Sequence, residues 1–302
     1  MSCDETLWHS LEEKARELGF IALGYTRPQA PPFFDQYAAW VNRGNQGDMA
    51  WLKRSMEVRK DPGRLLEGCR TIISLAFPYS AHKPATRDGF TLSRYTEPDK
   101  EDYHDRVRTL CNCLVELLQE CCYGSRSKVC VDSSPLVEKS LAYAAGIGFF
   151  GKNNMLIIPG YGSYFYLAEI LTTVPLESDN PEVMESQCGD CDMCIANCPT
   201  GALVRPFTLD ASRCLSYLTI EYKGDLDREA GKRMGDCFFG CDRCQEVCPF
   251  NGDGGDRRVV LPSTKVFLEM DESGFTAAFG KSALSRAGLR KIKSNIMTVV
   301  KS

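Results

Sequence analysis

The sequence contains no apolar run long enough to cross a membrane. A membrane helix needs roughly 20 consecutive apolar residues, and even the apolar segment YFYLAEILTTVPL is interrupted by Glu169. The first residues, MSCDETLWHS, are polar and acidic, unlike the basic and apolar start of a secretory signal peptide. We therefore expect a cytoplasmic protein whose 16 cysteines are reduced or metal-bound rather than paired in disulfides.

Two common cofactor-binding patterns are also missing. No G-x-G-x-x-G follows a predicted strand, so a nicotinamide or flavin site of the Rossmann type is unsupported. The glycine-spaced segment GIGFFGKNN has a different spacing from a P-loop and lacks its Lys-Ser/Thr pair. The only internal repetition is a pair of cysteine runs, which therefore carry most of the information about function.

Both cysteine runs lie between positions 188 and 249, and both end in Cys-Pro. The first, CGDCDMCIANCP, has the C-x2-C-x2-C-x3-C-P spacing of bacterial-type iron–sulfur proteins, and the second, CDRCQEVCP, has three cysteines. In two-cluster ferredoxins, three closely spaced thiolates bind one cluster and the last cysteine of the run binds the other. The spacing thus predicts one 4Fe–4S cluster held by Cys188, Cys191, Cys194 and Cys248, and a second held by Cys198, Cys241, Cys244 and a further ligand.

The spacing does not identify that further ligand. A regular second run would have a cysteine where Phe238 stands, so Cys214 and Cys237 are both candidates. Paired C-x2-C motifs can also bind zinc at two tetrahedral sites. Zinc ribbons lack the x3-C-P ending that both runs have, and this difference favours clusters over zinc.

Residues 1–177 show alternating helix and strand patterns that predict an α/β (α+β) domain. Apolar residues recur at helical spacing in 5–18, 34–44 and 102–122. The segments FIALGY, GCRTIISLAFPY, VCVD, MLIIP and GSYFYLAEILTTVP are typical of strands. Residues 178–262 are predicted to form a ferredoxin-like module with two 4Fe–4S clusters.

Residues 263–302 are predicted to form a tail of two short helices, with Leu284, Leu289, Ile292 and Ile296 facing the core. The tail is basic, with six basic residues and no acidic one from position 280 onward: Lys281, Arg286, Arg290, Lys291, Lys293 and Lys301. Such a run is usually a solvated helix face, and the net charge of −4 argues against a general nucleic-acid-binding protein. The run alone therefore does not establish phosphate binding.

A protein with two clusters either shuttles electrons or feeds them to an active site. A simple ferredoxin would not need the large α/β domain, which favours an enzyme. A non-catalytic electron-transfer protein stays open as the other class.

Motifs along nearly the whole chain match one known family. They are VRKDPGRLLEGCRTII, SRYTEPDKEDYH, VDSSPLVEKSLAYAAGIGFFGKNNMLI, GSYFYLAEILTTVPLESD, CGDCDMCIANCPTGAL, DASRCLSYLTIE, GCDRCQEVCPFN and SALSRAGLRKIKSNI. The sequence resembles the epoxyqueuosine reductases, cobalamin-dependent iron–sulfur enzymes of tRNA queuosine synthesis. A more distant likeness to reductive dehalogenases keeps a corrinoid reductase of a small organic substrate as the alternative.

The resemblance implies reduction of epoxyqueuosine to queuosine at the wobble position of tRNA, the last step of queuosine biosynthesis. It implies a base-off cobalamin between the N-terminal domain and the cluster module, with contacts from Arg59, Tyr95, Asp132, Lys152, Asn153 and Ser216. Cys214 matches the family's remaining ligand of the second cluster, which decides against Cys237. The implied partners are a tRNA anticodon stem-loop, whose phosphates the basic tail would bind, and an external electron donor of the ferredoxin or flavodoxin type.

Asp132 matches the catalytic acid of the family. Judged as a residue alone, it could simply cap a helix that starts at Pro135. As an acid it would protonate the departing epoxide oxygen, which requires a carboxyl kept protonated near neutral pH by burial in an apolar pocket. Phe149, Phe150 and Tyr166 are candidates for the walls of that pocket.

Overall fold

The computed structural model describes residues 3–176, 182–252 and 259–301. Its central sheet has four strands in the order β1-β2-β8-β5, formed by Ala22–Thr26, Thr71–Pro78, Phe165–Thr172 and Ser127–Cys130. All three strand pairs are antiparallel. The expected helices and strands of the N-terminal domain are present, and the predicted domain boundary at 177/178 lies outside the described residues.

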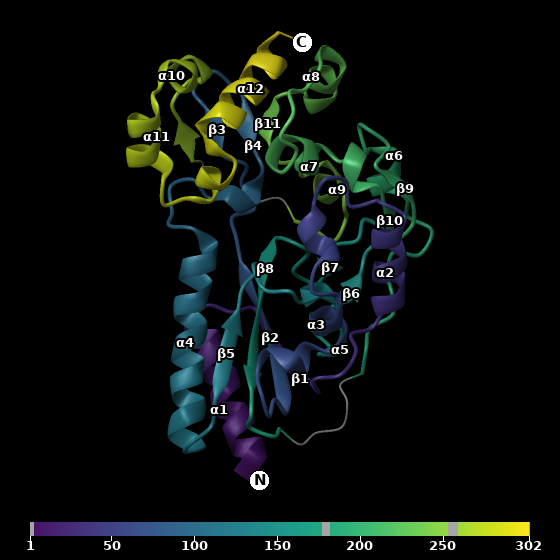
Figure 1. Cartoon of the computed structure of the whole chain (residues 1–302), viewed down its shortest axis with the longest axis vertical. Coiled ribbons are helices and arrows are strands. Elements are labelled where there is room, and N and C mark those ends of the chain that lie inside the picture. Colours follow the sequence, from purple (N-terminus) through teal and green to yellow (C-terminus); the bar gives the residue numbers. More distant parts are fainter. Residues whose placement is uncertain (1–2, 177–181, 253–258, 302) are drawn as a thin grey trace.

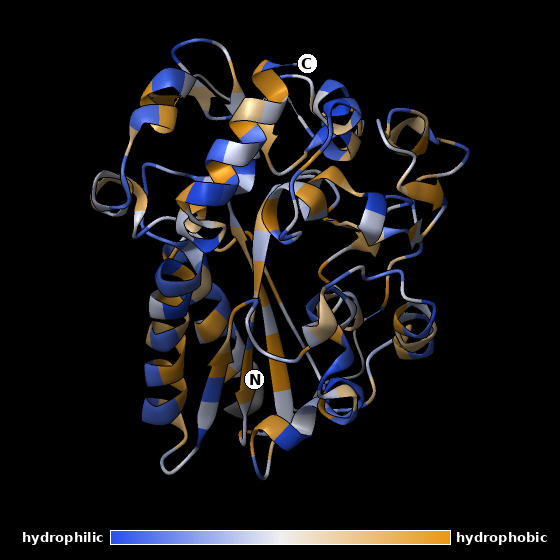
Figure 2. Ribbon diagram, turned by 45° about the horizontal axis from the view of Figure 1, so that its top comes forward, coloured by the Kyte–Doolittle hydropathy of each residue, from blue (hydrophilic) through white to orange (hydrophobic). Residues whose placement is uncertain are grey.

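Helices cover both faces of the central sheet (Figure 1). On one face lie α1 (Cys3–Glu17) and α4 (Tyr103–Cys121), the longest of the described helices. On the other face, α5 (Glu138–Ala144) packs against β1, β2 and β8. The long strands are mostly orange in Figure 2, whereas the helices carry both colours, as expected for helices that bury one side.

A second sheet, in the order β11-β4-β3-β12, joins segments that are distant in the sequence. β3 (Ala85–Thr86) and β4 (Thr91–Leu92) precede the cysteine runs, whereas β11 (Cys237–Phe239) lies between the two runs and β12 (Val260–Leu261) follows them. β11 is parallel to β4, and β12 is parallel to β3. This pairing attaches the segment before Tyr95 to the C-terminal part of the molecule.

The C-terminal segment packs around this second sheet and contains α10 (Thr264–Glu269), α11 (Glu272–Phe279), a 3-10 helix (Ala283–Arg286) and α12 (Gly288–Val300). The sequence predicted only two short helices here. The structure contains the additional helix α11, which starts after Asp271 because the side chain of Asp271 accepts a hydrogen bond from the backbone N–H of Gly274. The predicted core residues of the tail are buried, with at most 4% of their surface exposed: Leu284, Leu289, Ile292 and Ile296.

The cysteine runs form a small module above the central sheet. Each run contains a one-turn helix, α6 (Met193–Ala196) or α9 (Arg243–Glu246), and the two helices pack together. Around them lie β9 (Leu203–Arg205), β10 (Thr208–Leu209), α7 (Leu215–Ile220) and α8 (Arg228–Met234). The short elements that complete the fold are α2 (Phe34–Asn42), α3 (Met56–Lys60), β6 (Phe149–Phe150), β7 (Leu156–Ile157) and 3-10 helices at Ala50–Lys53, Pro62–Leu65, Arg94–Thr96 and Ala211–Arg213.

The turn after β5 departs from the predicted helix start. The chain does not become helical at Pro135, since α5 begins at Glu138 and its N-cap residue, Val137, provides no side-chain cap. Asp132 instead has a left-handed backbone conformation with φ 52°. Asp132 is therefore not a helix cap. Within the part of the chain that the structure describes, no helix has both the length and the apolar character needed to span a membrane.

Candidate active site at the junction of the central sheet and the cysteine module

The thiols of the two cysteine runs gather in two groups. Cys188, Cys191, Cys194 and Cys248 line a pocket of about 20 Å³. Cys198, Cys214, Cys241 and Cys244 line a larger cavity of about 400 Å³. The last cysteine of each run thus lies with the remaining thiols of the other run, Cys248 with three and Cys198 with two, which is the arrangement predicted from the spacing.

Cys214, and not Cys237, lies with the second group. Cys214 immediately precedes α7 and faces the 400 Å³ cavity. Cys237 lies in β11, is only 5% exposed, and its thiol donates to the carbonyl oxygens of Phe239 and Gly240 at 3.5 and 3.6 Å. Burial raises the pKa of Cys237 to about 11. Cys237 is therefore a core thiol.

Each thiol group has the number of ligands that one 4Fe–4S cluster needs. Such a cluster is held by four cysteine thiolates, and each group contains four thiols.

The larger cavity continues into a second one of about 440 Å³. Each volume lies in the range of roughly 300–1,000 Å³ that is usual for cofactor and substrate sites. The two cavities share several lining residues, among them Tyr95, Tyr103, Asp132, Lys139 and Ser216. Asp132 therefore lies at the junction of the two cavities, in a space that also reaches the second thiol group.

The carboxylate of Asp132 is held by three side chains. Its Oδ2 accepts hydrogen bonds from Tyr103 Oη at 3.0 Å and from Arg286 Nη1 at 3.1 Å. The same oxygen lies 3.0 Å from Nε2 of His104. On the other side of that ring, Nδ1 lies 2.7 Å from Oδ1 of Asp102, which also caps α4. His104 is therefore fixed between two carboxylates.

These contacts determine where the proton lies. Burial raises the pKa of Asp132, but the hydrogen bond from His104 and the charge of Arg286 outweigh burial and lower the pKa to about 2. Burial lowers the pKa of His104, but the bonds to Asp102 and Asp132 raise it to about 9. At neutral pH Asp132 is thus a carboxylate and His104 an imidazolium. The expectation that Asp132 stays protonated is wrong, because charged donors converge on it.

Tyrosines form much of the wall beside Asp132. The rings of Tyr103 and Tyr166 stack at 4.2 Å between centroids with 3° between planes, and Tyr166 Oη donates to the carbonyl oxygen of Tyr95. Tyr166 was correctly predicted as a wall residue. Phe149 and Phe150 do not line either cavity, because Phe149 packs in the core against Phe250 and the half-buried Phe150 packs against Phe33.

Comparisons with known proteins agree with these features. The family model described as "4Fe-4S double cluster binding domain" matches residues 187–251, and the one described as "Epoxyqueuosine reductase QueG, DUF1730" matches residues 59–133. An epoxyqueuosine reductase of Leadbetterella byssophila is 34% identical over 296 residues, which cover 94% of this chain and 95% of the relative. This chain belongs to the epoxyqueuosine reductase family.

Solved structures of epoxyqueuosine reductases have the same fold. The crystal structure of one with an epoxyqueuosine-modified tRNA-Tyr stem loop gives a TM-score of 0.88 at 31% identity, covering 98% of this chain and 81% of that chain. The enzyme from Bacillus subtilis, with the loop of a catalytic aspartate swung out of the active site, gives a TM-score of 0.83 at 31% identity, covering 98% and 82%. The predicted mixed α/β fold with a double-cluster domain is confirmed.

The residues predicted to contact cobalamin lie in different places. Tyr95, Asp132, Asn153 and Ser216 line the 400 Å³ cavity. Asn153 also connects the two thiol groups, because it lines the 20 Å³ pocket while its Nδ2 donates to the carbonyl oxygen of Cys244 at 3.1 Å.

Lys152 and Arg59 lie outside both large cavities. Nζ of Lys152 donates to the carbonyl oxygen of Gly189 at 2.6 Å, beside the first thiol group. Arg59 is 5% exposed, and its Nη1 donates to the carbonyl oxygen of Leu136 at 2.9 Å. Their contacts with a cofactor stay predictions.

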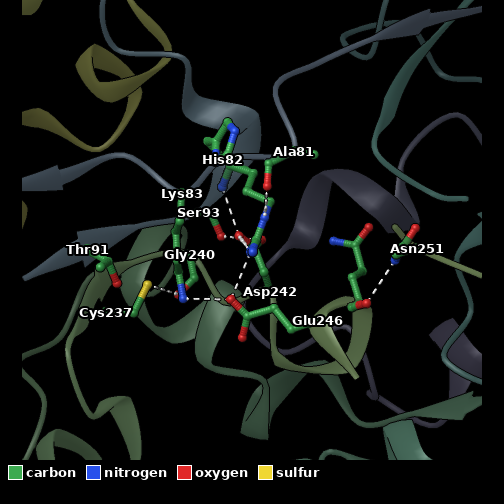
Figure 3. Close-up of polar contacts among 12 residues, drawn as sticks. Ala81, His82, Lys83, Thr91, Ser93, Cys237, Gly240, Asp242, Glu246 and Asn251 are labelled. Carbon is green, nitrogen blue, oxygen red and sulfur yellow. Dashed lines mark hydrogen bonds and ion pairs between the residues drawn. The ribbon is translucent and has the colours of Figure 1, made fainter. Parts of the chain in front are cut away.

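A buried ion-pair network ties the second cysteine run to the segment that carries Tyr95 (Figure 3). Asp242 lies between two cysteines of the run and accepts hydrogen bonds from Ser93 Oγ at 2.7 Å and from the backbone N–H of Arg94 at 2.8 Å. Arg94 also pairs with Glu246 at 2.8 Å, and Lys83 pairs with Glu246 at 3.0 Å. The network fixes the second thiol group relative to the tyrosine wall.

Two of the six basic tail residues are already engaged within the protein. Arg286 pairs with Asp132 and, through Nη2, with Glu221 at 3.0 Å. Lys291 is 8% exposed and donates to the carbonyl oxygen of Gly224 at 3.0 Å. Arg286 therefore holds Asp132, although its side chain is still 43% exposed. The four other basic residues of the tail keep exposed surface as well: Lys281, Arg290, Lys293 and Lys301.

Sequence reasoning missed Tyr103, His104 and Arg286 as site residues. A signal existed for the first two, because the segment SRYTEPDKEDYH was recognised as family-like and its Asp102-Tyr103-His104 begins a helix. No local signal distinguished Arg286 from the other basic residues of the tail.

Proposed function

We propose that this epoxyqueuosine reductase acts in queuosine biosynthesis on tRNA with a base-off cobalamin held in the cavities at Asp132 and with two 4Fe–4S clusters bound by the two thiol groups. The observation that carries the proposal is the common cavity: the thiols of Cys198, Cys214, Cys241 and Cys244 open into the space that Asp132 also lines. When bound and reduced, cobalamin would supply the two electrons that removal of the epoxide oxygen requires.

The residues present fit such a cofactor. The cavity combines a tyrosine wall with polar side chains such as Ser93, Asn153 and Ser216, and a mixture of apolar surface and polar groups suits a large organic cofactor. We assign cofactor contacts to Tyr95, Asn153 and Ser216, which line the cavity, and retain Arg59 and Lys152 as supports from outside it.

We assign the first proton of the reaction to His104. Loss of the epoxide oxygen as water consumes two protons, and a positioned acid accelerates the departure of the oxygen. His104 is an imidazolium at neutral pH and faces the 440 Å³ cavity. The proton would pass from its Nε2 to Oδ2 of Asp132, 3.0 Å away, and from Asp132 to the departing oxygen. Asp132 then acts as the catalytic relay, and Tyr103 and Arg286 hold its carboxylate.

The substrate is proposed to be a tRNA anticodon stem-loop. A relative was crystallised with an epoxyqueuosine-modified tRNA stem loop, which supports this assignment. Affinity for such a substrate comes largely from basic side chains on phosphates, and the accessible basic residues of the tail are suited to this role: Lys281, Arg290, Lys293 and Lys301. The modified nucleotide must leave the loop stack to enter the cavity.

Electrons are proposed to enter at the first thiol group from an external donor of the ferredoxin or flavodoxin type. The four cysteines of this group are partly exposed, which suits entry from a docked partner.

The test compares substrates with the anaerobically reconstituted full chain. Cobalamin-loaded, reduced protein should convert an epoxyqueuosine-modified anticodon stem-loop to the queuosine form, detected as loss of one oxygen by mass spectrometry. A panel of halogenated and epoxide small molecules should not react. Turnover of the small molecules without turnover of the stem-loop would overturn the assignment of tRNA as substrate.

A further inference from the structure

A row of directly paired residues crosses the central sheet beneath α5. Gly24 of β1 pairs with Ser74 of β2, Ser74 pairs with Glu169 of β8, and Glu169 pairs with Cys130 of β5. Residues directly opposite in antiparallel strands project to the same face. Cys130 packs there with Leu141 of α5, so the side chain of Glu169 lies on the face that α5 covers.

Glu169 is a carboxyl without a compensating charge. Its exposed surface is 0%, and neither carboxyl oxygen has a hydrogen-bond partner of normal geometry. Within the described residues, no Lys, Arg or His forms an ion pair with it. A lone ionised carboxylate in such a place is very costly. Burial, followed by the charge of Glu138, raises the pKa of Glu169 well above its ordinary value, so this side chain holds a proton at neutral pH.

Glu138 connects this buried carboxyl to Asp132. It is the first residue of α5 and lines the 400 Å³ cavity. Its Oε1 accepts the backbone N–H of Asp132 at 2.7 Å, an N–H that β5 does not pair because the strand ends at Cys130. This bond spans the turn and fixes Asp132 in its left-handed conformation, which is strained for a non-glycine residue.

We propose that Glu169 is a buried carboxyl that keeps its proton beneath α5, and that Glu138 is a positioning residue that holds the Asp132 turn in its reactive place. The proton on Glu169 lets Glu138 act as an acceptor for Asp132 without a second negative charge beneath α5. Burial, followed by the charge of Asp132, also raises the pKa of Glu138. The inference rests on the proposed function, because Asp132 is the residue being positioned.

The other titratable groups near Glu138 and Glu169 are Asp132 after β5, Cys130 on β5 and Lys139 on α5, while Cys111 on α4 lies across the sheet on the opposite face. Of these, Lys139 is the basic one, and it donates to the carbonyl oxygen of Asn154 at 3.1 Å. Among the described residues none of these groups forms an ion pair with Glu169, so the proton on Glu169 is what keeps a second negative charge from this face of the sheet.

The first test compares two substitutions at one position in the cobalamin-loaded holoenzyme. Glu138→Gln keeps an acceptor oxygen for the N–H of Asp132 but cannot ionise, whereas Glu138→Ala removes the acceptor. Loss of a buried acceptor corresponds to roughly tenfold or more in rate. We expect kcat on the modified stem-loop to be at least about tenfold higher for Glu138→Gln than for Glu138→Ala, with similar KM. Equal kcat in the two variants would overturn the positioning role.

The second test does not measure turnover, and it does not require that the Glu138→Ala variant folds. Infrared spectra of the wild-type protein near neutral pH should contain the carbonyl stretch of a protonated carboxylic acid. Glu169→Gln should remove this band, and Glu120→Gln, a change at an exposed glutamate of α4, should retain it. Absence of the band in the wild type overturns the protonated state of Glu169. A protein that shows the band but leaves the modified stem-loop unchanged supports the protonated Glu169 and overturns the proposed function, so the two failures are distinguishable.

Discussion

Nε2 of His104 lies 3.0 Å from Oδ2 of Asp132, and this relationship moves the proton of the site from the aspartate to the histidine. With a pKa of about 9, His104 carries its proton through the physiological range, whereas Asp132, with a pKa of about 2, does not. The aspartate can still pass a proton on, because it contacts the donor and lines the cavity.

We therefore expect His104→Asn to lower kcat by about 10²–10⁴-fold, the usual contribution of a positioned acid. Cluster and cobalamin content, measured by iron, sulfide and visible absorption, should stay at wild-type levels. His9→Asn is the matched control, since His9 is an exposed residue of α1 that pairs with Glu13. A His104→Asn variant with nearly wild-type kcat would remove His104 from proton transfer.

Asp132→Asn should also abolish most turnover, by about 10²-fold or more, because the amide cannot relay a proton. Tyr103 and Arg286 would lose their charged acceptor, but neither thiol group contains Asp132, so both clusters should load normally. Single-turnover assays on the modified stem-loop, with iron and corrin content measured on the same sample, test this expectation. Wild-type turnover in Asp132→Asn would show that the carboxylate has no part in the reaction.

The stability of the protein should decrease as the pH rises from about 6.5 to about 9. His104 has a pKa of about 9 when folded and near 6.5 when unfolded, so the folded state binds more proton in this window. Stability from this histidine is complete below the lower pKa and is lost as the pH passes the higher one. The effect, on the order of a few kcal/mol, should appear in urea unfolding midpoints and be smaller in His104→Asn. An identical pH dependence in both proteins would contradict the raised pKa.

Cys214→Ser and Cys237→Ser should differ sharply. Cys214 lies with the second thiol group, so its loss should remove one of the two clusters, whereas Cys237 is a core thiol and its replacement should leave both. Iron and sulfide analysis with electron paramagnetic resonance of the reduced protein distinguishes these outcomes. Loss of a cluster in Cys237→Ser but not in Cys214→Ser would reverse the ligand assignment.

Replacing Arg290, Lys293 and Lys301 together by Gln should reduce the salt dependence of stem-loop binding. Each lost phosphate contact lowers the slope of log Kd against log salt concentration by about 0.7–0.9. The control removes Lys14 and Arg16 of α1, at the opposite end of the molecule from the tail (Figure 1). Equal slopes for the wild type and the tail variant would exclude phosphate contacts by these residues.

The sequence was most informative where the chemistry depends on local spacing. The cysteine runs specify their own one-turn helices, so the two thiol groups could be predicted from the intervals between cysteines and from Cys-Pro. The helices and long strands could be predicted from the periodicity of apolar residues, because this periodicity is also a local feature of the sequence. The start of α5 was predicted at Pro135, whereas the helix begins at Glu138. The prediction missed that the side chain of Glu138, six residues along the chain, accepts a hydrogen bond from the backbone N–H of Asp132.

The environment of Asp132 could not be predicted in this way. Its partners Tyr103 and Arg286 are 29 and 154 residues away in the sequence, and only the folded chain brings them together. From the sequence alone, Asp132 was expected to lie between apolar walls, which would raise its pKa. The charged donors that reverse the shift come from α4 and from the 3-10 helix before α12.

The most direct test of the central claim is single-turnover conversion of the modified stem-loop by dithionite-reduced protein that contains both clusters, with and without cobalamin. If the cavity at Asp132 joins the second cluster to a corrinoid-dependent reaction, queuosine should form only in the cobalamin-loaded sample. Formation of queuosine at the same rate by cobalamin-free protein with both clusters would contradict the account.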